Sequence, residues 1–123
     1  MPDALVLVGH GSKYSEDDVL PYYVKYFEST GQFSEVRACY LERDPRVENI
    51  LQEITADRVY VMPLLLAHGY HTKVTIPEAL GIRQPHDFVA GKEIHYMEPL
   101  GRSEQIATLI RQRIDEAGLK LSH

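Results

Sequence analysis

The sequence predicts an α/β fold with a single doubly wound, mainly parallel four-stranded sheet flanked by helices, in the order βαβαβαβα. Two observations support this prediction. Four short segments of strand type alternate with segments in which apolar residues recur at i, i+3, i+4 and i+7. Strands that alternate with helices pair in parallel, and 123 residues is the length of one ordinary domain. We therefore expect residues 1–123 to form one α/β domain.

The first strand and helix are expected within the first 31 residues. Residues 4–8 (ALVLV) form a continuous apolar run, which predicts a strand buried on both faces. Apolar residues at helical spacing from Leu20 to Phe27 predict the helix that follows. Pro21 suits the first turn of this helix and Gly31 its end.

The middle of the chain repeats this pattern. Residues 36–41 mix β-branched, aromatic and small side chains and predict the second strand. Asp44 and Pro45 predict an N-cap followed by proline at the first helical position. A third strand is expected over residues 59–66, with Pro63 at its end. The helix between these strands has its apolar stripe at Val47, Ile50, Leu51 and Ile54.

The last third of the chain predicts two helices and one strand. Residues 76–80 are expected to form a short helix closed by Gly81, and the polar residues 81–91 a loop. Residues 93–98 alternate in polarity, as a less buried strand at the edge of the sheet would. Ser103 is the expected N-cap of the final helix. Its apolar stripe consists of Ile106, Leu109, Ile110 and Ile114.

Composition excludes several kinds of partner. The chain has 13 Lys and Arg against 18 Asp and Glu, a net charge of −5, which argues against non-specific nucleic-acid binding. No apolar run approaches the ~20 residues that cross a bilayer, and the N-terminus lacks the basic region of a signal peptide. The single cysteine, Cys39, lies inside a predicted strand and is expected to be a buried, inert thiol. We expect a cytoplasmic protein without a membrane or nucleic-acid partner.

Candidate functional residues follow three of the predicted strands. Residues 9–13 (GHGSK) come after the first strand, Glu42 after the second, and residues 67–73 (AHGYHTK) after the third. Ligands of an open parallel sheet bind beyond the carboxyl ends of its strands, so these side chains are expected at one edge. Imidazole pairs with a carboxylate suit cobalt, nickel, iron or zinc ions. The sequence therefore predicts a metal-handling site there.

Ordinary roles remain open for each residue taken alone. His10 can be a turn residue between two glycines, and Glu42 a surface charge at a strand end. His68 and His71 can be solvated loop residues. The segment that begins at Gly9 starts like a dinucleotide-binding motif, but a tyrosine stands at the position of the last glycine. Neither a Walker motif nor a nucleophile elbow is present.

Three segments of the chain resemble one enzyme family. The segments ALVLVGHGSK (4–13), PLLLAHGYHTKVTIPE (63–78) and EPLG (98–101) are similar to the small sirohydrochlorin chelatases of the CbiX type. These class II chelatases are related in fold to ferrochelatase. The resemblance implies a lyase that inserts a divalent metal ion into sirohydrochlorin without ATP. It implies no tightly bound cofactor, because the metal is a substrate.

The resemblance also implies roles for individual residues. The metal-handling histidines of the family fall on His10 and His71, and His68 falls at a position that the family leaves variable. Glu42 resembles a glutamate that often follows the second strand, which implies an acid–base role. The residues expected to bind the carboxylates of the tetrapyrrole or to line its cleft are Gly11, Ser12, Lys13, Tyr70, Thr72 and Lys73.

Cobalt is the first choice of metal and nickel the second, on the resemblance alone, with iron as a third possibility. Cobalt would imply cobalamin synthesis, nickel the nickel cofactor of methanogens, and iron sirohaem. A non-catalytic carrier of metal or tetrapyrrole is the alternative function, because the same histidines could sequester an ion. A small α/β hydrolase with His10 as its base is a further alternative.

A homodimer is the expected assembly. Longer relatives resemble two copies of this unit that face each other across the tetrapyrrole cleft, whereas this chain holds one. A single sheet offers one wall, and a bent macrocycle shielded from water needs two. Two-fold homodimers are the commonest oligomers, so we expect the active site at or near a subunit boundary.

Overall fold

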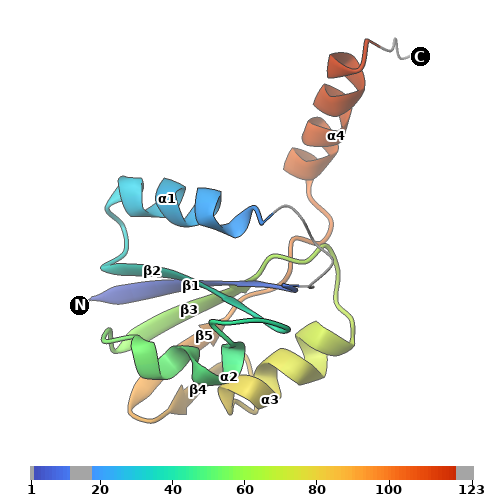
Figure 1. Ribbon diagram of the computed structural model, residues 1–123. Coiled ribbons are helices and arrows are strands. Elements are labelled where there is room, and N and C mark those ends of the chain that lie inside the picture. Colours follow the sequence, from blue (N-terminus) through green and yellow to red (C-terminus); the bar gives the residue numbers. More distant parts are fainter. Residues whose placement is uncertain (1, 12–17, 119–123) are drawn as a thin grey trace.

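The computed structural model describes residues 2–11 and 18–118, which form one sheet with helices on its two faces (Figure 1). The sheet has five strands in the order β2-β1-β3-β5-β4. Four strands pair in parallel, and β4 pairs antiparallel with β5. The strands are β1 (Asp3–Gly9), β2 (Glu35–Tyr40), β3 (Arg58–Pro63), β4 (His86–Val89) and β5 (Lys92–Tyr96). The predicted α/β class is confirmed, with one strand more than expected.

The additional strand, β4, lies in the segment expected to be a loop. It forms a hairpin with β5 through Ala90 and Gly91, whose φ angles of 51° and 79° are those of a tight hairpin turn. A single alanine and glycine give a weak turn signal, so the sequence did not reveal the hairpin. As a consequence β5 is an inner strand and β4 the edge, and the expectation that residues 93–98 lie at the edge was wrong.

Helical segments connect the strands. Helix α1 begins with Pro21 in its first turn and ends at Gly31, whose φ is 70°, as the sequence predicts. The helix over 76–80 is also confirmed, but a π-helical segment precedes it directly. The helical segments are α1 (Leu20–Thr30), α2 (Val47–Ile50), η1 (Leu51–Glu53), η2 (His71–Thr75), α3 (Ile76–Leu80) and α4 (Glu104–Glu116).

The start of α2 differs from the expectation. Its N-cap is Arg46, so Pro45 lies outside the helix, and the Asp44–Pro45 peptide bond is cis. The backbone explains the difference. The Pro45 carbonyl oxygen accepts a hydrogen bond from the Tyr40 N–H at 2.8 Å, which holds this segment extended beside β2 until Val47.

Both faces of β1 are buried, as its apolar run predicts. Val6 and Val8 pack with Val61 beneath α2 and α3. Leu5 and Leu7 point to the other face, which α1 covers in part. Because successive side chains of a strand alternate between faces, one run of five apolar residues supplies both layers of the core.

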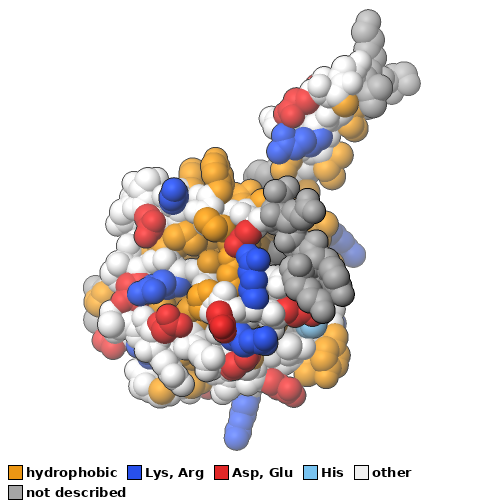
Figure 2. Space-filling model, in the orientation of Figure 1, with side chains coloured by type: hydrophobic (Ala, Val, Ile, Leu, Met, Phe, Trp, Pro, Cys, Tyr) orange, Lys and Arg blue, Asp and Glu red, His pale blue; other side chains and the backbone are white. Residues whose placement is uncertain are grey.

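Helix α4 has the predicted N-cap, Ser103, whose hydroxyl oxygen accepts a hydrogen bond from the Gln105 N–H at 3.2 Å. None of its residues is buried, and the helix projects away from the sheet (Figure 1). Its apolar stripe therefore does not contribute to the core. Figure 2 shows hydrophobic side chains around α1 and on the flank of α4. No helix among the described residues is long and apolar enough to cross a membrane.

Gly11 lies where the backbone turns beyond β1. Its φ of +71° is in the left-handed region, and a Cβ at this position would lie 2.7 Å from the Cβ of Tyr40. Both the backbone conformation and the close approach of Tyr40 therefore require glycine. Gly69 lies in the loop beyond β3, and a Cβ at that position would meet no other atom within 4 Å.

We expect Gly11→Ala to lower the free energy of unfolding by about 1–3 kcal/mol, because alanine would be forced into the left-handed region against Tyr40. Gly69→Ala is the matched control and should change it by less than about 0.5 kcal/mol. Urea denaturation followed by circular dichroism measures both values. Equal stabilities of the two variants would contradict this account of the turn.

Candidate functional site

The loops that follow β2, β1 and β3 lie side by side at the carboxyl edge of the sheet. The chain leaves β1 in one direction to form β2 and later returns to the other side of β1 to form β3. A parallel sheet opens a crevice where its strand order reverses in this way. Residues that follow β1 and β3 therefore flank the position at which this fold class binds ligands.

His10 and Glu42 meet at this edge. The Leu41 N–H donates to the Gly9 carbonyl at 3.1 Å, and the Glu42 N–H donates to the His10 carbonyl at 3.1 Å. These two bonds continue the pairing of β1 with β2 and set the two side chains next to each other. His10 Nε2 lies 3.6 Å from Glu42 Oε1, and the side chains are 45% and 51% exposed. The pair is therefore open to a large ligand.

His71 completes the group from the other side of the crevice. It is the first residue of η2, and its ring centroid lies 5.5 Å from that of His10, with 48° between the ring planes. His71 Nδ1 is 3.3 Å from the Thr75 hydroxyl oxygen. With Nδ1 engaged, Nε2 is the nitrogen that His71 can offer to a metal ion. Two imidazoles and a carboxylate can bind a divalent ion and accept protons.

Thr72 shapes the loop between β3 and α3. It is 2% exposed, and its hydroxyl accepts a hydrogen bond from the Gly69 N–H at 2.8 Å and contacts the Gly69 carbonyl at 3.1 Å. His68 Nδ1 lies 3.1 Å from the same hydroxyl, and its Nε2 contacts Glu98. This network holds the backbone that carries His71. The hydroxyl of Thr72 is thus engaged within the loop.

The other residues expected to contact substrate differ in where they lie and in whether the structure describes them. Tyr70 is 72% exposed beside His71, and Lys73 is exposed on η2. Lys73 also lines a cavity of about 210 Å³ together with His68 and Glu98. Gly11 follows His10 directly. Ser12 and Lys13, which the resemblance implies in substrate binding, lie outside the described residues.

A second cavity, of about 260 Å³, opens beside His10 and contains a polar group that the sequence did not reveal. The Tyr40 hydroxyl donates a hydrogen bond to Asp18, and the Arg43 guanidinium pairs with the same carboxylate. The guanidinium carbon also lies 4.4 Å from the centre of the Tyr40 ring. Arg43 therefore supplies a cation near His10. Its place directly after Glu42 was the only signal for it in the sequence.

Burial sets the ionisation of two nearby side chains. The pKa of Tyr40 is raised, mainly by burial and then by its hydrogen bond to Asp18, so its hydroxyl remains neutral at physiological pH. Burial raises the pKa of the Cys39 thiol to about 12. This thiol is fully buried, which confirms the predicted burial of Cys39, and a buried neutral thiol is expected to react little.

Known proteins that are similar to this chain include sirohydrochlorin chelatases. The family model CbiX matches residues 4–117. A sirohydrochlorin cobaltochelatase of Methanopyrus kandleri is 36% identical over 138 residues, which cover 93% of this chain and 96% of that protein. A probable sirohydrochlorin cobaltochelatase of Halobacterium salinarum is 32% identical over 129 residues; they cover 89% of this chain, but only 44% of that longer relative.

A solved structure shares the fold. The sirohydrochlorin chelatase SirB from Bacillus subtilis subspecies spizizenii, in complex with cobalt, aligns with a TM-score of 0.74 at 24% identity. The alignment covers 94% of this chain and 51% of that chain. The match of the family model over almost the whole chain, together with relatives of similar length, shows that this chain belongs to the CbiX family.

Proposed function

We propose that this protein is a cytoplasmic chelatase, a lyase that inserts a divalent metal ion into sirohydrochlorin without ATP. The observation that carries the proposal is the convergence of His10, His71 and Glu42 at the crevice of a CbiX-family sheet. Cobalt is the first choice of metal, supported by relatives that are sirohydrochlorin cobaltochelatases, and nickel is the second. Affinity for imidazole sites rises from iron through cobalt to nickel, so the histidines alone do not select the ion.

Metal insertion exchanges two pyrrole N–H protons for bonds from the ring nitrogens to the ion. His10 and His71 would hold the ion through their imidazole nitrogens. Once the ion has passed to the ring, the nitrogens that it leaves would accept the two departing protons. An imidazole suits both tasks because its ordinary pKa of about 6.5 lies near physiological pH. The Glu42 carboxylate, 3.6 Å from His10 Nε2, would stabilise the imidazole that has taken a proton.

Sirohydrochlorin is a polycarboxylate, so cations and N–H donors are needed around the ring. Arg43 lines the cavity beside His10, and Lys73 follows His71 by two residues on η2, so both can supply positive charge to the carboxylates of the ring. The exposed ring of Tyr70 offers a surface for the macrocycle. The net charge of −5 makes such local donors more important, because the overall field does not attract an anion.

We expect His10→Ala and His71→Ala each to lower the rate of cobalt insertion at least about 100-fold, because each removes a metal ligand and proton acceptor. Insertion is followed by the change in the absorption spectrum of sirohydrochlorin. Circular dichroism should show an unchanged fold, since both side chains lie outside the core.

His95→Ala is the control, because His95 lies on β5 and not at the carboxyl edge. This variant should keep its activity. An equal loss of activity in all three variants would contradict the assignment of His10 and His71.

We expect Glu42→Gln to lower turnover about fivefold while cobalt still binds, since an exposed pair of this kind contributes about 1 kcal/mol. Asp44→Asn is the matched control, because this neighbouring carboxylate is 92% exposed and lies 4.0 Å from Arg46. Steady-state rates and calorimetric cobalt binding measure the two effects. Turnover that is equal in both variants would return Glu42 to the role of a surface charge.

We further propose that the protein acts as a homodimer in which each subunit covers an open face of the other. An apolar groove of about 450 Å³ lies on the sheet face that α1 only partly covers. A parallel sheet ordinarily has both faces covered. Helix α4 carries an apolar stripe with Leu109 43% and Ile110 57% exposed. The groove is lined chiefly by Leu5, Leu7, Phe27, Tyr60, Met62 and Leu100.

The helix that fills this groove would come from the second subunit. The segment that precedes α4 is fixed to the sheet edge, because the N–H groups of Leu100 and Gly101 donate to the carbonyls of Leu65 and Leu66 at 2.9 and 2.6 Å. From this anchor the helix points away from its own sheet (Figure 1). Leu64 lines both the groove and the cavity beside His10. A two-fold exchange of helices would therefore bring the subunit boundary to the active site.

We expect the wild-type protein to have twice the chain mass of 14.1 kDa in light scattering, and Leu109→Asp with Ile110→Asp to reduce it to 14.1 kDa. Charges on the apolar stripe would prevent burial of α4 in the partner. Thr108→Asp with Gln112→Asp, on the opposite side of the helix, is the control and should remain dimeric. A fully active wild-type monomer, or a dimer that the stripe variant leaves intact, would contradict the proposal.

A further inference from the structure

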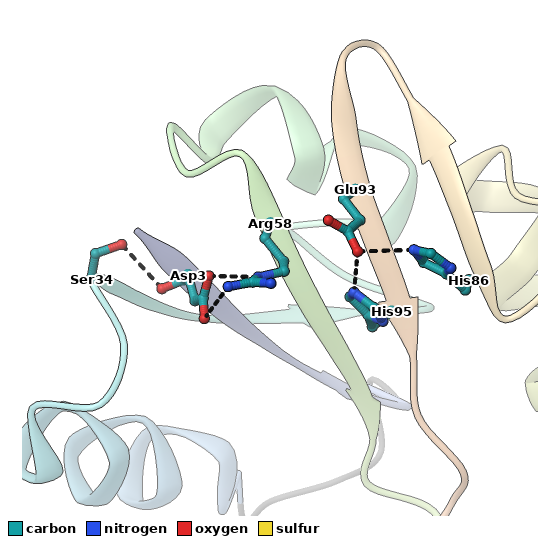
Figure 3. A network of polar contacts seen from close by, with 6 residues as sticks. All are labelled: Asp3, Ser34, Arg58, His86, Glu93 and His95. Carbon is teal, nitrogen blue, oxygen red and sulfur yellow. Dashed lines mark hydrogen bonds and ion pairs between the residues drawn. The ribbon is translucent and has the colours of Figure 1, made fainter. Parts of the chain in front are cut away.

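Three metal-ligating side chains converge at the other end of the sheet, on the hairpin of β4 and β5. His86 lies on β4 directly opposite His95 on β5, and Glu93 precedes His95 by two residues on the same face. Figure 3 shows both rings directed toward the Glu93 carboxylate. The ligand atoms of the three residues all lie within 4.8 Å of one another.

The geometry of this group is defined by direct contacts. Glu93 Oε2 lies 2.9 Å from His86 Nε2 and 2.7 Å from His95 Nε2. The two imidazole rings are stacked, with centroids 4.5 Å apart and planes 11° apart. Tyr60 stacks on His95, with centroids 5.0 Å apart. Two paired strands and a stack of three rings therefore hold the donor atoms in place before any ligand binds.

The charge of Glu93 is available to a cation. Arg58 is its neighbour on β3, but the Arg58 guanidinium is engaged with Asp3, at 2.9 Å from Nε to Oδ1 (Figure 3). The side chains of His86, Glu93 and His95 are 55%, 32% and 25% exposed, so an ion can reach them from solvent.

We propose that His86, Glu93 and His95 bind a first-row divalent cation, through one nitrogen of each imidazole and a carboxylate oxygen. Two imidazoles and one carboxylate form a ligand set suited to zinc, cobalt or nickel, and water would complete the coordination. Each neutral imidazole becomes a ligand at Nε2 when its proton resides on Nδ1, so no redox or other chemical step is involved.

This site is separate from the proposed active site. Glu93 pairs with Arg58, which pairs with Asp3 at the start of β1, whereas His10 follows the end of β1. Seven residues of strand at about 3.3 Å each place roughly 20 Å between the two ends. The second site therefore does not depend on the proposed chelatase activity.

Cation binding at this position would stabilise the edge of the sheet. The ligands come from both strands of the β4–β5 hairpin, so a bound ion would link the edge strand to its inner neighbour. An ion that binds the folded chain more tightly than the unfolded chain raises the unfolding temperature by mass action. The site would thus serve as a structural clip.

Titration with Zn²⁺ alone, by calorimetry and thermal unfolding, tests the proposal. The variant His10→Ala with His71→Ala should keep one Zn²⁺ site and its thermal stabilisation. His86→Ala and His95→Ala should each weaken that site at least about tenfold and abolish the stabilisation. His68→Ala is the matched control, since this histidine also contacts a glutamate but does not belong to the three-donor cluster.

Nuclear magnetic resonance with Co²⁺ locates the ion in the unaltered protein and does not depend on how the variants fold. Paramagnetic broadening should reach the backbone N–H signals of His86 and of residues 93–95 as well as those near His10. The proposal is overturned if broadening is confined to the carboxyl edge, or if His86→Ala and His95→Ala leave Zn²⁺ affinity at the wild-type value.

Discussion

Parallel pairing of β1 with a strand on each side is the constraint on which the site depends. The hydrogen-bonded ladder does not end with the strands. Beyond β2 the Glu42 N–H donates to the carbonyl of His10, and beyond β3 the Leu64 N–H donates to the carbonyl of Val8 at 2.9 Å. Backbone bonds therefore bring a carboxylate and the start of a histidine-bearing loop to the end of β1. The Thr72 hydroxyl, buried beneath the loop, then supports the segment that presents His71.

The same architecture leaves the site open, as the large macrocycle of the proposed function requires. The imidazoles and the carboxylate stand at the rim rather than inside an enclosed pocket. A single sheet supplies one wall, and the apolar groove next to α1 is left for another element to cover. Helix α4 has an apolar stripe that is not buried, and the groove is also lined by apolar side chains. A second subunit would cover both the open side of the site and the uncovered sheet face.

Local signals in the sequence predicted most of the fold. The apolar run of β1, the glycine that ends α1 and the cap of α4 are each decided by residues within a few positions, so their patterns were reliable. The sequence failed where distant contacts decide. Pro45 is held extended by β2, and β4 exists only through its pairing with β5. Because that hairpin was missed, the cluster of His86 with Glu93 could not be predicted either.

In the candidate site, too, the residues placed by local sequence patterns were predicted, and the residue placed by a distant contact was not. His10, His71 and Glu42 each lie at a strand end or in a loop that the strand pattern locates, so their convergence could be predicted. The Arg43 side chain is held by Asp18, which lies 25 residues away in the sequence, so no local pattern revealed its place in the site.

The most direct test of the central claim counts sirohydrochlorin molecules converted per subunit with excess Co²⁺ and no ATP. A chelatase converts many molecules per subunit, whereas conversion or binding that stops at one would contradict the account.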